Sequence, residues 1–289
     1  IMKIALIQMK GKSSNDDNIE IALEQIEKAS ASGADFVVLP EMFSCPYKAS
    51  NFPVYAQEDG GKNWQKLSAA ARKNKIYLVA GSMPELEISE ENGSRVEKIY
   101  NTSYVFDRTG KQIAKHRKMH LFDCDIPSAR FYESETLSPG KSVTVFDTEF
   151  GKIGLMICFD IRFPELARLM VDKGAKLIVV PAAFNMTSGP AWWDIMFRAR
   201  ATDNQVFMAG CSPARDENAG YVAWGHSLFV DPFGKILAQL DEKENILLCD
   251  LQLEQVDDFR NQYKILTARR KDVYSLVECK KATENNADI

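Results

Sequence analysis

The sequence predicts an α/β fold, because short apolar runs of strand length alternate with amphipathic helical segments along the chain. No segment rich in proline, glycine and serine interrupts this alternation, which favours one domain over two linked modules. We expect this domain to cover residues 2–280, with Met2 as the native start and a C-terminal arm from about residue 263. Residues 281–289 are polar and are expected to form a flexible tail.

The first elements are a strand, a helix and a second strand. Residues 3–9 form an apolar run, and residues 15–33 then carry apolar side chains at helical spacing, with caps expected at 15–17 and a stop at Gly33. Residues 36–39 are continuously apolar, which is typical of a strand buried on both faces. This strand leads into Glu41, so a charged side chain is expected at its C-terminal end.

The same alternation continues through the rest of the chain. The segment 85–98 is polar and contains the turn signal Asn92-Gly93. We expect helices over 62–74, 163–173 and 190–203 and from about 254, with strands over 76–82, 176–180, 205–210 and 246–250. Hairpins are expected from 99–107 with 111–115, 142–147 with 152–157, and 227–230 with 236–239. In both halves an apolar strand ends at a reactive residue, which suggests two similar sheets that face each other.

Composition excludes several classes of protein. The 289 residues are 45% hydrophobic and 26% charged, as in ordinary globular proteins, which excludes a disordered or fibrous chain. A net charge of -4 gives no basic surplus for binding a phosphate backbone, so nucleic acid is not an expected partner. No apolar run approaches the roughly 20 residues that a membrane-spanning helix needs, so no membrane partner is expected either.

Cysteine and histidine usage predicts a reducing compartment and no metal site. The six cysteines are never closer than 30 residues, so no Cys-x-x-Cys pair is present, and we expect a cytoplasmic protein with mostly buried thiols. His116 and His120 are four residues apart but lack the glutamate of a His-Glu-x-x-His helix. We therefore expect neither a metal nor another cofactor, and a structural role for the histidines.

Cys158 is the strongest candidate nucleophile. It follows a buried-strand pattern and precedes a helix that begins near Pro164, an arrangement that outlines a nucleophile elbow. Backbone amides and the positive helix N-terminus at such a turn favour a thiolate. The alternative is a small buried core cysteine. Asp160 and Arg162 weaken that alternative, because a purely structural strand end does not need two charged residues.

A cysteine nucleophile needs a base and a group that stabilises the oxyanion. Glu41 at the end of a buried strand and Lys118, where a strand breaks into a loop, are better placed than the histidines. The alternative for either residue alone is a surface charge or a structural ion pair. A redox-sensing thiol would need a resolving cysteine close to Cys158, and the sequence offers none nearby.

Three segments together resemble the signature segments of the nitrilase superfamily of carbon-nitrogen hydrolases. The segments are Pro-Glu-Met-Phe at 40–43, His-Arg-Lys-Met-His-Leu-Phe-Asp at 116–123 and Gly-Leu-Met-Ile-Cys-Phe-Asp-Ile-Arg-Phe-Pro-Glu at 154–165. They occur in the family's order. Lys118 lies 77 positions after Glu41, and Cys158 lies 40 positions after Lys118, spacings that also suit the family. The resemblance covers nearly the whole chain. It implies a four-layer α-β-β-α sandwich of two facing sheets, paired into a homodimer or a larger homo-oligomer.

The resemblance also implies roles for individual residues. Glu41 would be the general base, Lys118 the stabiliser of the tetrahedral intermediate and Cys158 the nucleophile, with the backbone amide of Phe159 as second oxyanion donor. Glu133 is the expected auxiliary acid, with Glu135 as the alternative. The ammonium of Lys118 is expected to lower the pKa of the Cys158 thiol at rest.

Within the superfamily the sequence is most similar to the omega-amidase branch, which implies hydrolysis of the terminal amide of 2-oxoglutaramate or 2-oxosuccinamate to the 2-oxo dicarboxylate and ammonia. The segments that carry this similarity are 44–47, 120–123, 183–185, 188–190, 203–206, 212–215 and 221–226. The alternatives are an N-carbamoyl amino acid hydrolase or another aliphatic amide hydrolase of the same superfamily and, from another class, a non-catalytic metabolite-binding protein.

A carboxylate-bearing amide needs a cationic receptor away from the reacting carbon. We expect Arg162 to bind that carboxylate with help from Ser188, because a guanidinium can bind it through two parallel hydrogen bonds. Phe184 would form a wall of this pocket, and Tyr47 would lie near Glu41. The alternative is that Arg162 pairs with Asp160 or Glu165. Trp192, Trp193 and Phe197 lie at helical spacing and are expected in the core.

Overall fold

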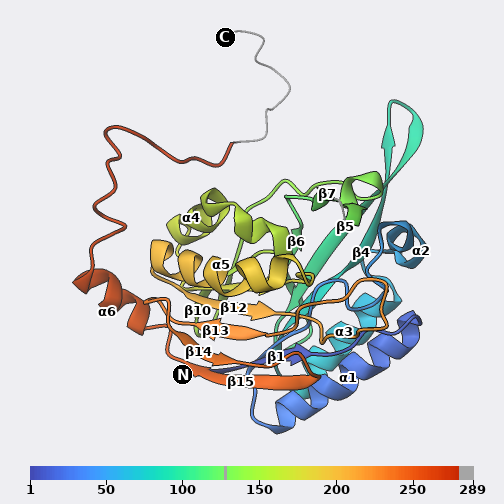
Figure 1. The fold of residues 1–289 in the computed structure, drawn as a ribbon, viewed down its shortest axis with the longest axis horizontal. Coiled ribbons are helices and arrows are strands. Elements are labelled where there is room, and N and C mark those ends of the chain that lie inside the picture. Colours follow the sequence, from blue (N-terminus) through green and yellow to red (C-terminus); the bar gives the residue numbers. More distant parts are fainter. Residues whose placement is uncertain (127–128, 280–289) are drawn as a thin grey trace.

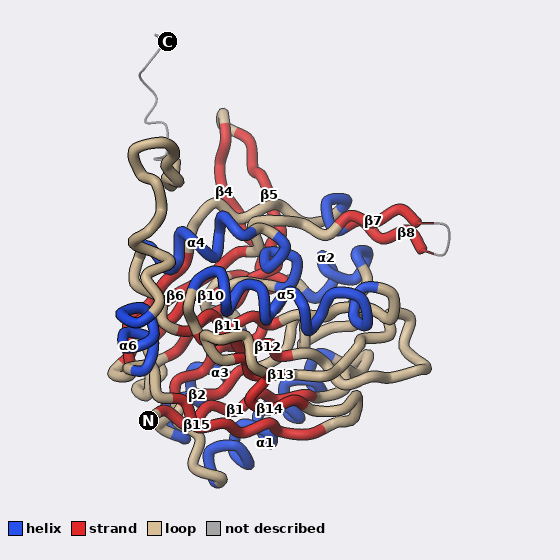
Figure 2. Tube along the Cα trace, turned by 60° about the vertical axis from the view of Figure 1, so that its left-hand side comes forward, coloured by secondary structure: helices blue, strands red, loops and turns tan. Residues whose placement is uncertain are grey.

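The computed structural model describes residues 1–126 and 129–279, and its architecture confirms the expected four-layer sandwich (Figure 1). Two large sheets face each other in the middle of the molecule, and helices cover the outer face of each sheet. Figure 2 shows the same layers from another side.

The first sheet has seven strands. Its order is β15-β1-β2-β4-β5-β6, with β3 paired to β4; β1, β2 and β4 are parallel, and β15, β5 and β6 add antiparallel pairs. The strands are β1 (Met2–Gln8), β2 (Phe36–Val38), β3 (Gln57–Glu58), β4 (Tyr77–Glu91), β5 (Ser94–Phe106), β6 (Gln112–Arg117) and β15 (Asn245–Leu251).

The second sheet has six strands in the order β14-β13-β12-β11-β10-β9. Its centre, β10, β11 and β12, is parallel, and hairpin strands flank it on both sides. The strands are β9 (Thr144–Thr148), β10 (Gly151–Leu155), β11 (Leu177–Pro181), β12 (Phe207–Cys211), β13 (Leu228–Val230) and β14 (Ile236–Gln239).

Helices form the two outer layers. The α-helices are α1 (Asn15–Ala31), α2 (Phe52–Tyr55), α3 (Lys62–Asn74), α4 (Pro164–Asp172), α5 (Ser188–Asn204) and α6 (Gln255–Gln262), and the 3₁₀ turns are η1 (Ala49–Asn51), η2 (Glu133–Glu135) and η3 (Cys158–Arg162). Apolar side chains of α1 and α3 pack on the first sheet, and those of α4 and α5 pack on the second. The cap of α1 is Ser14, whose hydroxyl accepts from the Asp17 amide, so the expected cap at 15–17 was one residue late.

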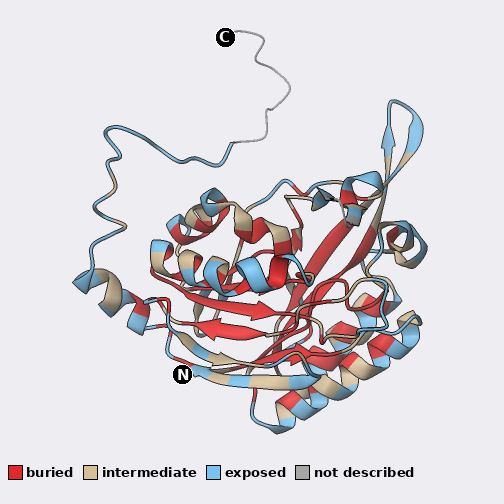
Figure 3. Cartoon of the chain, in the orientation of Figure 1, coloured by how far each residue is buried: buried red, intermediate tan, exposed pale blue. Residues whose placement is uncertain are grey.

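An apolar core fills the space between the two sheets (Figure 3). Phe36 of β2 stacks on Tyr77 of β4 at 6.0 Å between ring centroids, and on Phe146 of β9 in the opposite sheet at 6.4 Å. Burial of this surface on both sides explains why the central strands read as continuous apolar runs rather than as alternating patterns.

Two hairpins differ from the sequence prediction. The polar segment 85–98 is not a loop: β4 and β5 continue through it as a long hairpin that turns at Asn92 and Gly93 and projects from the body in Figure 2. Its outer residues are exposed on both faces, so no apolar periodicity revealed the strands. A second, unexpected hairpin pairs β7 (Asp123–Ile126) with β8 (Ala129–Tyr132).

After β15 of the first sheet the chain continues through α6. From Tyr263 to Cys279 it has no helix or strand, and this segment is the arm. Two ion pairs hold the arm to the end of α4, Arg269 with Asp172 at 2.6 Å and Glu278 with Lys173 at 2.6 Å. The predicted tail at 281–289 lies outside the described residues. Among the helices that are described, none combines the length and apolarity needed to cross a membrane.

Candidate active site

The predicted catalytic side chains lie just beyond the C-terminal ends of strands in the two facing sheets. Glu41 follows β2, Lys118 follows β6 directly, and Cys158 follows β10. Cys158 opens the 3₁₀ turn η3 between β10 and α4, so the expected strand-to-helix elbow contains one extra turn. The φ angle of Cys158 is 45°, a conformation that costs energy for a residue with a side chain and is often found at functional sites.

A buried cluster joins Lys118 to two carboxylates. The Lys118 ammonium lies 3.0 Å from Glu41 and 2.9 Å from Glu133, and all three side chains are fully buried. Tyr47 donates its hydroxyl to Glu133 at 2.8 Å and to Glu41 at 3.3 Å. The structure thus brings the predicted base, stabiliser and auxiliary acid into one hydrogen-bonded group.

The two oxygens of Glu41 have different partners. Oε1 accepts hydrogen bonds from Lys118, from Tyr47 and from the Asn101 amide at 2.9 Å. Among the described residues, Oε2 accepts one hydrogen bond, from the backbone N–H of Ala183 at 2.8 Å. Ala183 also lines the cavity that contains Cys158. Oε2 thus has fewer hydrogen-bond partners than Oε1, and it retains capacity to accept a proton.

The charge balance of the cluster is uneven. Burial acts to lower the pKa of Lys118, but Glu133 and Glu41 outweigh it and hold that pKa well above its usual range, so the amine is protonated. Burial raises the pKa of Glu133, and the Lys118 charge opposes this rise. A single cation thus compensates two buried carboxyl groups.

The net effect on Cys158 is opposite to the sequence prediction. Burial and then the charge of Glu41 raise the pKa of the thiol well above its ordinary value, and the opposing effect of Lys118 is smaller. Lys118 does lower the pKa as expected, but this effect is too small to set the protonation state of the thiol. A neutral thiol at rest has to lose its proton as it attacks, and Glu41 is the carboxylate whose charge acts most strongly on the sulfur.

Glu133 and Glu135 occupy different environments although both lie on η2. Glu133 is fully buried and also accepts the backbone N–H of Phe122 at 2.7 Å. Glu135 is half exposed and pairs with Arg130 at 2.9 Å. Of the two glutamates, Glu133 is the one that pairs with Lys118.

The candidate substrate residues surround the thiol in a small cavity. Phe159, Arg162, Phe184 and Ser188 line it together with Cys158, and residues that the sequence did not single out for the site, Phe122, Ala183, Trp192 and Tyr221, complete it. Ser188 exchanges hydrogen bonds with Asn185, at 3.0 and 3.1 Å, which fixes its hydroxyl at the start of α5. Phe184 packs edge-on against Trp193 at 5.1 Å.

Arg162 lines this cavity and carries a buried hydrogen-bond donor without a partner among the described residues. Its guanidinium lies over the Trp192 ring at 4.4 Å, and its buried Nη1 has no partner among the described residues. Within that same part of the chain Arg162 forms no ion pair with Asp160 or Glu165. The carboxylate of Asp160 instead binds His116 and His120. The alternative pairing is thus not found, and an anionic group could satisfy Nη1.

Three aromatic residues of α5 lie in two different environments, the apolar core and the cavity. Trp193 and Phe197 are buried and pack at 4.7 Å, as the helical spacing predicted. Trp192 is 41% exposed and forms the surface under Arg162, so its assignment to the core was wrong. Helical periodicity alone could not separate adjacent tryptophans that point to different sides of α5.

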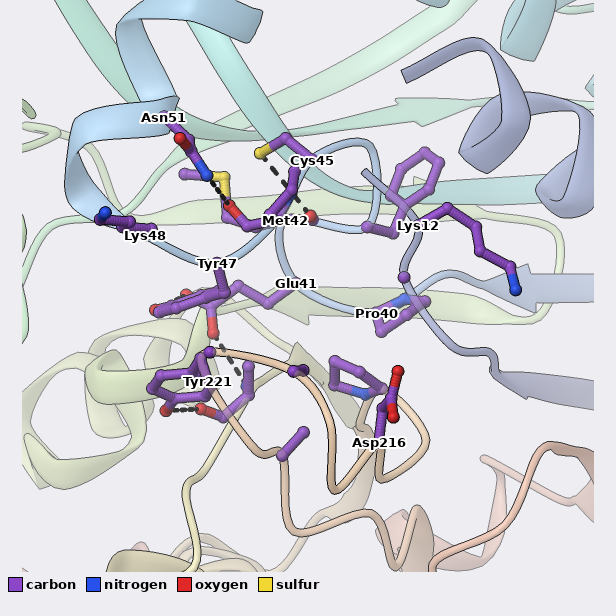
Figure 4. A pocket seen from close by; sticks show the side chains of 18 of the residues that line it. Lys12, Pro40, Glu41, Met42, Cys45, Tyr47, Lys48, Asn51, Asp216 and Tyr221 are labelled. Atoms are coloured by element: carbon purple, nitrogen blue, oxygen red, sulfur yellow. Dashed lines mark hydrogen bonds between the residues drawn. The ribbon is translucent and has the colours of Figure 1, made fainter. Parts of the chain in front are cut away.

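A larger cavity of about 680 Å³ also reaches the cluster (Figure 4). Glu41 and Tyr47 line it, and Ala183 and Tyr221 line both cavities. Tyr221 donates its hydroxyl to the Ala183 carbonyl, and its ring lies 4.5 Å from that of Tyr47. Lys12 and Lys48 lie on opposite sides of this cavity and can attract anionic ligands to it.

Two residues of this region, Asn101 and Tyr221, were missed as site residues. Asn101 lies in a hairpin strand with no motif around it, and only its pairing with Glu41 reveals its position. Tyr221 falls in one of the segments that carried the resemblance to omega-amidases. Among the described residues, no group of three or more histidine, cysteine, aspartate or glutamate side chains could hold a metal ion.

Comparison with known proteins gives concordant matches. The family described as "Carbon-nitrogen hydrolase" matches residues 3–261. "Omega-amidase NIT2" from Mus musculus is 47% identical over 280 residues, 96% of this chain and 98% of that protein. The crystal structure of Saccharomyces cerevisiae Nit3, described as a member of branch 10 of the nitrilase superfamily, matches with a TM-score of 0.83 and 42% identity, over 93% of this chain and 96% of that chain.

A second solved structure is relevant to the cysteine. It is a mutant of the amidase from Nesterenkonia sp. AN1 with the acetamide moiety of fluoroacetamide covalently added at the active-site cysteine. This structure matches with a TM-score of 0.76 and 27% identity, over 94% of this chain and 95% of that chain.

Proposed function

Because this chain belongs to the carbon-nitrogen hydrolase family, we propose that it is an omega-amidase that acts through a Cys158 thioester. Its substrate is a small amide with a distant carboxylate, such as 2-oxoglutaramate or 2-oxosuccinamate, and its products are the 2-oxo dicarboxylate and ammonia. The main support for this proposal is that Cys158 and Arg162, whose buried Nη1 has no partner among the described residues, line the same cavity.

The first half of the reaction forms the thioester. Cys158 gives its proton to Glu41 Oε2 while its sulfur attacks the amide carbon. Lys118 and the backbone amide of Phe159 stabilise the negative charge that develops on the carbonyl oxygen. The carbon-nitrogen bond then breaks, the proton on Glu41 moves to the nitrogen, and ammonia leaves.

The second half returns the enzyme to its starting state. A water molecule gives a proton to Glu41 and attacks the thioester carbon, the carbon-sulfur bond breaks, and the proton returns to the sulfur. Glu133 keeps Lys118 charged and in place through both halves, which the 2.9 Å contact between them supports. Tyr47 holds Glu133 and Glu41 together by donating to both.

Arg162 selects the substrate by its carboxylate, aided by Ser188, with Phe184 as the apolar wall. Arg162→Lys is therefore expected to raise KM for a carboxylate-bearing amide about 10- to 100-fold, the effect of losing hydrogen bonds worth about 1.5–3 kcal/mol to a charged group. For a neutral amide of the same length KM should change less than about threefold. Steady-state kinetics on the matched pair of amides measure both values, and equal changes would remove Arg162 from this role.

Glu41→Gln separates turnover from thiol reactivity. Hydrolysis is expected to fall about 10²–10⁴-fold, the usual contribution of a positioned general base. Since the charge of Glu41 raises the pKa of Cys158, its removal lowers that pKa, and alkylation by iodoacetamide reaches its half-maximal rate at a lower pH than in the wild type. Mass spectrometry of the tryptic peptide 153–162, which holds Cys158 and no other cysteine, follows the alkylation. An upward shift of that pH would contradict the proposed proton acceptor.

Ammonia release from a panel of amides tests the proposed function. The panel contains 2-oxoglutaramate, 2-oxosuccinamate, an N-carbamoyl amino acid and a neutral aliphatic amide. A kcat/KM that is highest for the two 2-oxo acid amides supports the proposal. Preference for the carbamoyl or neutral compound assigns another activity of the superfamily. Ammonia release from none of them identifies a metabolite-binding protein, for which isothermal titration would still detect the 2-oxo acids.

We further propose that the catalytic unit is a homodimer in the cytoplasm. Exposed apolar side chains support an interface between copies: Ile195 on α5 is 58% exposed and Val273 on the arm 69% exposed. All six cysteines are unpaired, which suits a reducing compartment. Sedimentation velocity should give twice the mass of 32.5 kDa.

A further inference from the structure

We propose that Asp160 is a positioning residue that sets the distance between Lys118 and Cys158, and this inference rests on the amidase function proposed above. Asp160 lies two residues after the nucleophile, and its carboxylate is fully buried. In the described structure it forms no hydrogen bond or ion pair with the side chains of Glu41, Lys118 and Cys158. It does bind residues on both sides of Lys118 and the residue before Cys158.

Each oxygen of Asp160 has its own set of donors. Oδ1 accepts from the backbone N–H groups of Met119 and His120, at 3.2 and 3.0 Å, and from His120 Nδ1 at 2.8 Å. Oδ2 accepts from His116 Nε2 at 2.9 Å and from the backbone N–H of Ile157 at 3.1 Å. These contacts connect the loop that carries Lys118 to the turn that carries Cys158.

The two connected segments belong to different sheets. The backbone of Lys118 is fixed to the first sheet, because its N–H donates to the Asn101 carbonyl at 2.8 Å and its carbonyl accepts from Gly140 at 2.8 Å. Cys158 follows β10 of the second sheet. His116 contributes to this junction as well, since its Nδ1 lies 2.9 Å from Thr144 Oγ1 on β9. Asp160 therefore spans the boundary between the sheets beside the reacting sulfur.

The pKa of Asp160 agrees with a carboxylate that stays charged while it holds the two segments together. Although burial acts to raise the pKa of Asp160, the hydrogen bonds from His116 and His120 outweigh it and hold that pKa well below its usual range. A charged carboxylate is an acceptor at both oxygens, so all five N–H groups point to it. An asparagine of the same size replaces one oxygen with a donor. It therefore loses either the Oδ1 contacts to Met119 and His120 or the Oδ2 contacts to His116 and Ile157.

The test compares Asp160→Asn with a control aspartate in the β5–β6 hairpin, whose second strand leads to Lys118. Asp107 also accepts two backbone N–H groups, those of Thr109 at 2.8 Å and Lys111 at 3.1 Å, but it lies at the far end of β6 from Lys118. With the best amide of the panel, Asp160→Asn is expected to lower kcat about 10²-fold, the cost of a misplaced catalytic group, with KM changed less than about threefold. Asp107→Asn should keep the wild-type kcat.

Conservative variants of His116 separate positioning from folding. His116→Gln retains an N–H where Nε2 donates to Asp160, whereas His116→Ala does not. We expect His116→Gln to retain at least about ten times the kcat of His116→Ala, with thermal unfolding measured for both variants. Equal kcat values for the two, or a wild-type kcat in Asp160→Asn with only a lower Tm, would overturn the proposal and leave Asp160 a purely structural residue.

A second substrate keeps this inference separate from the amidase proposal. Hydrolysis of p-nitrophenyl acetate reports attack by Cys158 and oxyanion stabilisation without requiring any amide to be a substrate. If the wild type releases ammonia from no amide but Asp160→Asn still slows ester hydrolysis about 10²-fold, the amidase proposal fails and the positioning role stands. Unchanged ester hydrolysis in Asp160→Asn would overturn the positioning role whatever the amide results are.

Discussion

Replacing Cys158 by alanine is expected to abolish ammonia release, with a fall in kcat on the order of 10⁴–10⁶-fold, as for other enzymes that lose their covalent nucleophile. The reason is chemical: Glu41, Lys118 and the cavity remain, but no group can form the acyl intermediate. Substrate should still bind, since Arg162 and the apolar wall are unchanged. Ammonia production and equilibrium binding of the substrate acid measure the two effects separately.

Cys249→Ala is the matched control for this variant. Cys249 lies on β15 at the edge of the first sheet, where it is half-buried and outside both cavities that reach the cluster. The same truncation there should leave kcat and KM unchanged. Amide hydrolysis that survives Cys158→Ala would end the covalent mechanism, and a loss of activity in Cys249→Ala would show that the assay responds to general damage.

Lys118→Met is expected to remove activity and to destabilise the fold at the same time. Without the ammonium the buried carboxyl groups of Glu41 and Glu133 face each other unpaired, and breaking a buried ion pair in this way costs about 3–5 kcal/mol of unfolding free energy. The loss of an oxyanion donor should lower kcat by at least about 10²–10³-fold. Denaturant unfolding and steady-state kinetics measure the two losses.

The double variant Lys118→Met with Glu133→Gln separates these effects. Neutralising Glu133 removes one of the two unpaired charges, so we expect much of the lost stability to return, while kcat stays low because no cation faces the substrate oxygen. Recovery of kcat together with stability would mean that Lys118 is only a structural counter-ion. A Lys118→Met protein that is as stable as the wild type would contradict the charge balance of the cluster.

Much of the fold could be predicted from the sequence because its strands are buried on both faces. Continuous apolar runs such as 36–39 and 177–180 mark the centres of the two sheets, and α3 begins and ends at the predicted residues, 62–74. The long β4–β5 hairpin could not be predicted in the same way. Its outer half lies in solvent, so its stability comes from cross-strand pairing rather than from an apolar pattern.

The candidate site likewise contains residues that could be predicted from the sequence and residues that could not. The positions of Glu41, Lys118 and Cys158 at or near strand ends made them candidates, and the resemblance of their three segments to the nitrilase superfamily then selected them and implied their roles. Neighbours that act through three-dimensional contact could not be selected, as with Asn101 and its bond to Glu41. The pKa of Cys158 was misjudged for the same reason, since sequence reasoning identified the nearby ammonium but not the complete burial of the sulfur.

In the proposed mechanism the sulfur of Cys158 carries the acyl group of the substrate as a thioester. The Glu41→Gln variant offers the most direct way to observe this thioester. This variant lowers the thiol pKa and lacks the base that activates water, so a p-nitrophenyl ester should acylate it once and deacylate slowly. Mass spectrometry of the peptide 153–162 should then find one acyl group for each chain. An unmodified Cys158, or an acyl group on a different cysteine, would contradict the thioester mechanism.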